Sequence, residues 1–192
     1  MKISLKWLRE YIDYQGTADE LAILLTKAGL EVEGIEKIGK GIDQVIVGKV
    51  KSKTKHPDAD TLSICTVFDG KEDLQIVCGA PNVDVGQTIA LAPIGCSLPT
   101  PDNVGFKIKK SKIRGVESFG MICAEDELGL STDHNGIMIL SDDLKAGQKF
   151  SEALGLPWEV LEISITPNRA DCLSYFGVAL EVAAATGLKI KT

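Results

Sequence analysis

The sequence predicts an α+β protein in which a small β-barrel interrupts a helical domain. From about residue 45 to about residue 140, short apolar runs are separated by Gly, Pro, Asn and Asp turn signals, which favours a small sandwich or barrel. Helical periodicity occurs before and after this region. Each helical segment is too short to bury a core alone, so we expect the two to form one discontinuous domain.

The first helical segment has clear start and stop signals. A short opening helix places its apolar residues on one face, with Ser4 positioned to cap it: Leu5, Leu8 and Ile12. Thr17 and Glu20 form a capping box for a second helix, and Gly29 is placed to end it. The run "LEVEGIEKI" then alternates apolar and polar residues, as a half-buried strand does.

The central region contains six strand-like runs, and a helix is predicted after it. The runs are QVIVGKVKSKTKH, TLSICTVFDG, LQIVCGAP, TIALAPIG, FKIKKSKIRG and GIMIL. Gly70 in "DGKED" is expected to take a positive φ in a hairpin turn. A final helix begins near Asp171, and its predicted apolar face contains Leu173, Phe176, Leu180, Ala183 and Ala184.

Composition limits the possible functions. The chain has 192 residues and a net charge of -6, which argues against a surface that is basic throughout, so nucleic-acid binding would need a local patch. The first residues carry charges that break any signal-peptide core, and no apolar run reaches the roughly 20 residues of a membrane span. The five cysteines include no C-x-x-C pair, which favours reduced thiols in the cytoplasm over a disulfide framework or a zinc site.

The motif "HPDAD", residues 56 to 60, combines an imidazole with two carboxylates. A calcium loop would need a glycine that this motif lacks, and the only other histidine, His134, is far along the chain. A turn is therefore favoured over a metal or catalytic site. In that turn Asp58 and Asp60 are expected to accept hydrogen bonds from backbone N–H groups.

Residues 105 to 115, "GFKIKKSKIRG", contain five cations and no carboxylate. Such a cluster is a candidate phosphate contact, because amines along one groove release counterions together. A solvated edge strand, where lysines discourage aggregation, explains the composition equally well. The candidate RNA-binding residues in this segment are Lys107, Lys109, Lys110, Lys112 and Arg114.

A second lysine row has period two, which predicts that all four side chains point to one face of a strand: Lys49, Lys51, Lys53 and Lys55. Two basic strands in one small barrel favour nucleic-acid binding. Aromatic residues for stacking are scarce, so recognition of folded RNA by shape and backbone fits better than reading of an open single strand. The Asn82 amide, in a turn with free backbone N–H groups, is a further candidate phosphate contact, although a tight strand connection is the simpler explanation.

No catalytic centre is predicted. Ser118 has no evident base partner, and the carboxylates near Cys123 would raise its pKa rather than activate it. No P-loop or dinucleotide fingerprint occurs. We therefore expect no catalytic residue, no metal ligand and no cofactor in this chain.

Three central segments resemble, in order and spacing, the tRNA-binding domain found in several aminoacyl-tRNA synthetases: "HPDADTL", "IVCGAPNV" and "KIKKSKIRGVESFGMICAEDELGL". The resemblance implies an OB-fold barrel over residues 40–150. The flanking segments resemble the two halves of the first domain of the bacterial phenylalanyl-tRNA synthetase beta-subunit family: "MKISLKWLREYI", "ELAILLTKAGLEVEGIE" and "ITPNRADCLSYFGVALEVAAATG". Residues 1–39 and 151–192 would then be the halves of one small winged-helix-like helical domain.

This second resemblance implies a role in a larger enzyme. Complete members of the family form an α2β2 tetramer with an alpha subunit and charge tRNA with phenylalanine, using ATP and Mg²⁺. The family's synthetic and editing sites lie outside the part that this chain resembles. We expect an N-terminal, non-catalytic fragment that binds tRNA, does not contact membrane and lies in the cytoplasm.

A structural role is the alternative, in which the barrel mainly braces neighbouring domains. Residues 40–150 hold 13 Lys and Arg against 15 Asp and Glu, so only the distribution of charge favours RNA. A free-standing chaperone or esterase is a poorer explanation, because no nucleophile has a base.

Overall fold

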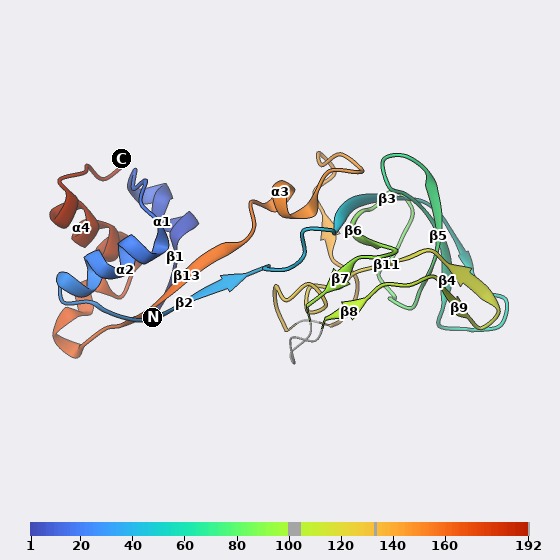
Figure 1. The fold of residues 1–192 in the computed structure, drawn as a ribbon, viewed down its shortest axis with the longest axis horizontal. Helices are drawn as coiled ribbons and strands as arrows, with labels where there is room; N and C mark the ends of the chain where they lie inside the picture. The colour runs from blue at the N-terminus through green and yellow to red at the C-terminus, as the bar shows by residue number, and fades with distance from the viewer. Residues whose placement is uncertain (100–104, 133, 192) are drawn as a thin grey trace. The chain divides into compact units, whose positions relative to one another are not determined.

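The computed structural model of the chain describes residues 1–99, 105–132 and 134–191. It divides into two compact units, each described by itself below: a helical unit, Met1–Ile38 with Pro157–Thr192, and a barrel unit, Gly39–Leu156. Most of the regular structure in the barrel unit is sheet (Figure 1). Among helices built from the described residues, none has both the length and the apolar character that crossing a membrane requires.

The helical unit combines an antiparallel three-stranded sheet of order β1-β13-β2 with three α-helices (Figure 1). Its strands are β1 (Lys2–Ser4), β2 (Glu31–Ile38) and β13 (Trp158–Ser164). Its helices are α1 (Leu5–Tyr11), α2 (Ala18–Lys27), the 3₁₀ helix η1 (Pro167–Cys172) and α4 (Tyr175–Thr186). One apolar core joins residues from both ends of the chain, such as Leu8, Leu21, Leu161 and Val178.

Local signals set the helix ends as the sequence predicts, with one exception. The Thr17 side chain accepts from Glu20 N–H, and the Glu20 carboxylate accepts from Thr17 N–H, which completes the capping box. Gly29 has a φ of 88° just after α2, and a positive φ is what glycine adopts without strain. Ser4 is the N-cap residue of α1, but its side chain makes no capping hydrogen bond.

Helix α4 buries a different face from the one predicted. Its buried residues are Gly177, Val178, Ala179 and Val182. Leu173, Phe176 and Leu180, which the sequence assigns to the core, are instead 62%, 50% and 47% exposed. The helix begins at Tyr175, four residues after Asp171; Ser174 is its N-cap, and the Ser174 hydroxyl accepts from Gly177 N–H at 3.0 Å.

The barrel unit is built on an antiparallel sheet of order β11-β6-β3-β4-β5, to which β12 adds by pairing with β6. The strands of this sheet are β3 (Ile46–Lys55), β4 (Ser63–Phe68), β5 (Asp73–Cys78), β6 (Thr88–Pro93), β11 (Gly120–Ile122) and β12 (Ile139–Leu140). Two short ribbons accompany it: β7 (Ser97–Leu98) with β8 (Phe106–Lys107), and β9 (Ser111–Ile113) with β10 (Val116–Ser118). Helix α3 (Phe150–Leu154) ends the unit.

Strand β6 is buried on both faces. Ile89 and Leu91 belong to one apolar cluster, and Ala90 and Ala92 belong to another. The continuous apolar run TIALAP is therefore what a central strand between two cores requires, whereas a half-exposed strand would alternate. Phe150 of α3 is fully buried in the second cluster, which ties this helix to the barrel unit.

The sheet nearly closes between β5 and the segment that leads into β11. Phe119 N–H donates to Gln75 O at 2.9 Å, and the Gln75 side-chain amide donates to Glu117 O at 2.8 Å. The buried Ser118 hydroxyl accepts from Val77 N–H at 3.1 Å and donates to Gly120 O at 3.1 Å. These bonds join the two ends of the sheet, so the fold is barrel-like. Beyond Val77 the two segments diverge.

Candidate nucleic-acid interface

The lysines of β3 do not share one face. Cross-strand partners lie on the same face of a sheet, and Lys49 pairs with Phe68 whereas Lys53 pairs with Cys65. Phe68 and Cys65 are three residues apart on β4, so they lie on opposite faces. The cause is a register shift between Val50 and Ser52, which reverses the alternation halfway along the row. The prediction of a single basic face on β3 is wrong.

Each lysine of this β3 row also has an acceptor within the barrel unit. Three form ion pairs: Lys49 with Asp142 at 2.8 Å, Lys51 with Asp73 at 2.7 Å and Lys55 with Asp60 at 2.8 Å. The ammonium group of Lys53 donates to Val83 O at 2.6 Å. Hydrogen bonds from Lys49 and Thr88 hold the pKa of Asp142 below its usual range, so that partner stays ionised. The charge of the row is largely compensated.

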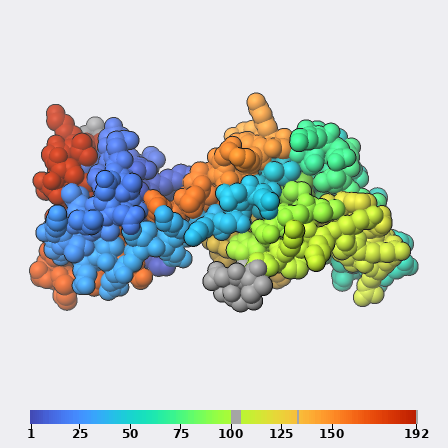
Figure 2. All heavy atoms as spheres, viewed as in Figure 1, coloured from blue at the N-terminus to red at the C-terminus, as the bar shows by residue number. Residues whose placement is uncertain are grey.

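The basic segment of residues 105–115 has a different local structure. Residues 106 and 107 form β8, and β9 then pairs with β10 in a hairpin whose closing pair is Ile113 with Val116. Arg114 and Gly115 are its two turn residues, with φ values of 43° and 89°. Positive φ at both central positions is the mark of a type I′ turn. Figure 2 shows the segment, in yellow-green, at the surface of the barrel unit.

Arg114 is held at the tip of this hairpin in the left-handed region. Among the described residues it is the one non-glycine residue with a positive φ. That conformation costs an L-residue on the order of 1 kcal/mol, and glycine, asparagine and aspartate are the residues that usually adopt it. An arginine in this position keeps a guanidinium exposed at the tip, at a small cost in stability.

Four of the five cations in this segment have no acidic partner among the residues that the structure describes: Lys107, Lys109, Lys112 and Arg114. All four are exposed. Lys110 is paired with Glu117 at 2.8 Å and lies 4.9 Å from the centre of the Phe119 ring. Glu117 is also the cross-strand neighbour of Lys112, so its carboxylate reduces the positive electrostatic potential around Lys112. The uncompensated positive charge of the predicted site is thus concentrated between residues 107 and 114.

Asn82 has a structural use instead of a free amide. Its side-chain nitrogen donates to Ile137 O at 2.9 Å, and its side-chain oxygen accepts from Ile137 N–H at 2.9 Å. This pair of bonds joins the loop after β5 to the segment before β12. The amide is therefore committed to a tight connection, the simpler of the two explanations considered from the sequence.

HPDAD forms a turn between β3 and β4, but His56 rather than the aspartates organises it. His56 is buried; its Nδ1 accepts from Asp58 N–H at 3.1 Å, and its Nε2 lies 3.2 Å from Ile113 O. Because Nδ1 accepts, the ring is neutral and Nε2 carries the proton that it donates to Ile113 O. The Asp60 carboxylate pairs with Lys55 instead of a backbone N–H. Among the described residues no backbone N–H donates to the Asp58 or Asp60 carboxylate, so the predicted aspartate caps are wrong, and the turn is tied to the hairpin that carries Arg114.

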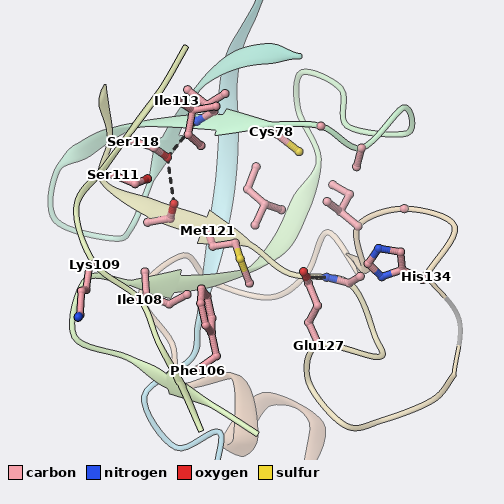
Figure 3. Close-up of a pocket in the computed structure, with 18 of the residues that line it drawn as sticks. Cys78, Phe106, Ile108, Lys109, Ser111, Ile113, Ser118, Met121, Glu127 and His134 are labelled. Carbon is pink, nitrogen blue, oxygen red and sulfur yellow. Dashed lines mark hydrogen bonds between the residues drawn. The ribbon is translucent and has the colours of Figure 1, made fainter. Parts of the chain in front are cut away.

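A pocket of about 870 Å³ opens in the barrel unit where β5 and β11 diverge. Its apolar wall includes Val77, Met121 and Ile137, and its rim includes Lys107 and Lys109. In Figure 3 the Phe106 ring points toward Met121, while Lys109 and His134 lie at opposite sides of the view. The unpaired cations and an open apolar chamber therefore adjoin.

Residues 45–149 match the family described as "Putative tRNA binding domain". The match covers more than half of the chain and includes the unpaired cations and the pocket. The chain belongs to this tRNA-binding domain family.

Curated relatives are similar to the chain along nearly its whole length, beyond the tRNA-binding domain. The chain is 52% identical over 190 residues to the phenylalanine–tRNA ligase beta subunit of Geobacter sulfurreducens, and 50% identical over 191 residues to that of Nitratidesulfovibrio vulgaris. The chain spans 23% of the length of each. Among solved structures, a MetRS-related protein from Pyrococcus horikoshii shares 22% identity at a TM-score of 0.39, and the match covers 55% of this chain and 87% of that one.

The thiols of this tRNA-binding domain are poor nucleophiles. All five cysteines of the chain are free and buried. Burial raises the pKa of Cys65 to about 11, and burial followed by the Glu127 charge raises the pKa of Cys123 further. The Ser118 hydroxyl donates to a backbone carbonyl. These groups support the barrel and offer no activated nucleophile.

Outside the tRNA-binding domain, one acidic cluster in the helical unit is filled by a cation. Asp171, Cys172 and Glu181 lie close enough to share a metal ion. The Arg169 guanidinium occupies that place, 3.1 Å from the Asp171 carboxylate and 2.8 Å from the Glu181 carboxylate. The cluster therefore acts as an internal ion-pair network between η1 and α4.

Two features of the tRNA-binding domain were missed by sequence reasoning. Phe106 is 56% exposed and lines the pocket, and the sequence analysis did not include it among the candidate binding residues. Alternation in "GFKIKK" puts Phe106 and Ile108 on one side of an extended segment, so no local signal separates the exposed Phe106 from the buried Ile108. Glu127 and His134 also line the pocket, and nothing local in the sequence indicates it.

Proposed function

We propose that this chain is the tRNA-binding and scaffolding portion of a phenylalanine–tRNA ligase beta subunit and has no catalytic centre of its own. The observation that carries the proposal is the cluster of unpaired cations, Lys107, Lys109, Lys112 and Arg114, inside the region that matches the tRNA-binding family. Identity near 50% along the whole chain supports the assignment to the ligase. Phosphates of folded RNA are the ligands that such exposed cations suit.

The finer description of the fold is part of this proposal. We assign the barrel unit to the OB-fold class; a five-strand path β11-β6-β3-β4-β5, with hydrogen bonds between β5 and residues 117–119, supports this. We assign the helical unit to a winged-helix-like class, with β2 and β13 as the wing. RNA binding is assigned to residues 40–150, and scaffolding to residues 1–39 with 151–192.

The properties of the whole enzyme are proposed on the same basis. The relatives are named as beta subunits of a ligase for phenylalanine and its tRNA. We propose an alpha-subunit partner in an α2β2 tetramer, ATP and Mg²⁺ as requirements of the complete enzyme, and a cytoplasmic location. Five free buried cysteines are consistent with a reducing compartment.

The test replaces Lys107, Lys109, Lys112 and Arg114 with Ala and measures tRNA retention by mobility shift at several salt concentrations. Each phosphate contact adds roughly 0.7 to 0.9 to the slope of log K against log salt, so the slope should fall by about three. Low-salt affinity should fall at least tenfold. A thermal melt of each variant establishes that it folds.

The matched control removes the same number of charges from cations that already have acidic partners: Lys2, Lys37, Lys149 and Lys191. Both variants change the net charge equally, so a purely long-range effect would weaken tRNA binding by both to the same extent. Equal loss in the two variants, or retention unchanged by the first, would contradict the assignment of this surface.

A brace between domains is the second candidate, and one observation favours it. Leu173, just before α4, and Phe176 and Leu180 on α4 are exposed apolar residues, and exposed apolar patches usually mark contacts with another protein surface. If the chain mainly braces neighbouring domains, the unmodified chain should bind tRNA weakly. Hydrogen exchange at α4 should then slow in the complete subunit relative to this chain.

A further inference from the structure

The pocket between β5 and β11 has the dimensions of a small-ligand site. Its volume of about 870 Å³ falls in the range of roughly 300 to 1,000 Å³ that such sites occupy, and the mouths of small barrels are a usual position for them. A single nucleotide fits within this volume. Its walls come from sequence-distant segments, the end of β5, β8, β11 and residues 134–137.

One side of the pocket offers an aromatic face. Phe106 lies on β8, where its cross-strand partner is Leu98, and it remains 56% exposed while Leu98 is buried. An exposed phenylalanine loses solvent contact when a flat ring stacks on it. Bases stack on such side chains whatever their identity, because each has a π face.

The rim next to Phe106 is positively charged. Lys107 and Lys109 line the pocket and have no carboxylate partner among residues 1–99, 105–132 and 134–191. A ligand that is planar and apolar at one end and anionic at the other suits this combination. A nucleotide has that construction.

The opposite wall carries hydrogen-bond acceptors. Glu127 is held by Ala124 N–H, which donates to one carboxylate oxygen at 2.7 Å. Nδ1 of His134 lies 2.8 Å from the Asp126 carboxylate, and an ionised carboxylate only accepts, so this nitrogen donates. In a neutral ring Nε2 is then an acceptor. Acceptors on this wall favour bases with amino groups, namely adenine, cytosine and guanine, over uracil.

We propose that this pocket takes one unpaired base of the bound RNA, stacked against Phe106 with its amino-bearing edge toward Glu127 and its flanking phosphates near Lys107 and Lys109. The inference rests on the proposed RNA-binding function and adds a subsite to it. Recognition would then combine backbone contact along residues 107–114 with insertion of one base that is not paired in the folded RNA.

The test compares an RNA duplex with the same duplex carrying a single-nucleotide bulge, by fluorescence anisotropy with the full chain. The bulged duplex should bind about tenfold more tightly than the perfect one, with A, C or G in the bulge preferred over U. Phe106→Ala should remove the advantage of the bulge and leave affinity for the perfect duplex and its salt slope unchanged. Phe106→Tyr should retain the advantage, because stacking survives.

Glu127→Gln tests the polar wall. A glutamine oxygen can still accept from Ala124 N–H, while its amide nitrogen can donate to uracil, so the preference against U should disappear. Ile139→Ala is the control for loss of an apolar side chain, since Ile139 is 51% exposed in the same unit and does not line the pocket.

The outcomes separate this inference from the function on which it rests. Equal wild-type affinity for bulged and perfect duplexes, or a Phe106→Ala loss that is the same for both, would overturn the base subsite while RNA binding stands. No binding to either duplex would instead remove the proposed function. Displacement of the bulged RNA by free CMP at a similar concentration would also overturn the subsite, because the ligand would then be a free nucleotide.

Discussion

The barrel unit carries two basic segments that look alike in sequence and differ in structure. In the β3 row, Lys49, Lys51 and Lys55 are each within 2.8 Å of a carboxylate oxygen. In the segment from residue 107 to residue 114, Lys110 alone has such a partner among the described residues. The first segment lies on β3, inside the order β11-β6-β3-β4-β5, although only its Lys49 end is paired with strands on both sides. The second segment forms short ribbons and a hairpin tip outside that sheet.

The position in the sheet explains the difference. The carboxylates that pair with β3 come from other elements of the same sheet: Asp73 begins β5, which pairs with the neighbouring strand β4, and Asp142 follows β12, which pairs with the neighbouring strand β6. A hairpin at an edge has one neighbouring strand, so fewer side chains can reach its cations. Lysine content therefore overestimates the charge available to a ligand where other elements of the sheet supply carboxylates, and measures it better in a short ribbon outside that sheet.

The largest expected effect concerns His56, which links the two segments. His56→Ala leaves the partly buried Ile113 carbonyl and the Asp58 N–H without their partners, and should lower the free energy of unfolding by roughly 2 to 4 kcal/mol. Urea denaturation measures this. His134→Ala is the matched control, since that ring is exposed, and should change stability by less than about 0.5 kcal/mol. Equal losses in the two variants would show that His56 does not hold the turn to the hairpin.

The second prediction removes the structural difference between the segments. Replacing Asp60, Asp73 and Asp142 with Asn frees three lysines of the β3 row. If ion pairing is what keeps these lysines from binding RNA phosphates, low-salt tRNA affinity should rise about tenfold and the salt slope should steepen by up to about three. The loss of three surface ion pairs should cost at most about 1 kcal/mol each.

The control for this variant replaces Asp43, Asp58 and Asp143, for which no lysine partner is present among the described residues. It removes the same three negative charges from the same unit. A rise of equal size in both variants would mean that net charge, and not pairing, decides the affinity.

Short-range signals predicted much of the fold. The capping box at Thr17, the stop at Gly29 and the turn at Gly70, whose φ is 97°, each depend on residues within one turn of one another. The face of α4 was beyond such reasoning. "FGVALEVAAA" is apolar on nearly every side, so periodicity had no contrast from which to choose the buried face.

For the candidate site, too, short-range sequence patterns predicted only part of the structure. The sequence identified every cation of residues 107–114, but it could not separate them from the β3 row. That separation depends on the register shift after Val50 and on carboxylates as distant in sequence as Asp142. The function of His56 likewise depends on the Ile113 carbonyl, 57 residues away. Local pattern located the charges, and long-range contacts decided which remain available.

The smallest expected effect concerns the turn that presents Arg114. Arg114→Asn gives the Asn-Gly pair that type I′ turns favour and relieves the positive φ of 43°, so it should raise the free energy of unfolding by about 0.5 to 1 kcal/mol. It also removes one cation, which should lower the salt slope of tRNA binding by about one. Arg114→Lys retains charge and backbone strain, so neither quantity should change. Loss of stability in the Asn variant would mean that the Arg114 guanidinium stabilises the folded hairpin. The charge at this position would then be used in contacts within the chain, as in the β3 row, and the contrast between the two segments would not hold.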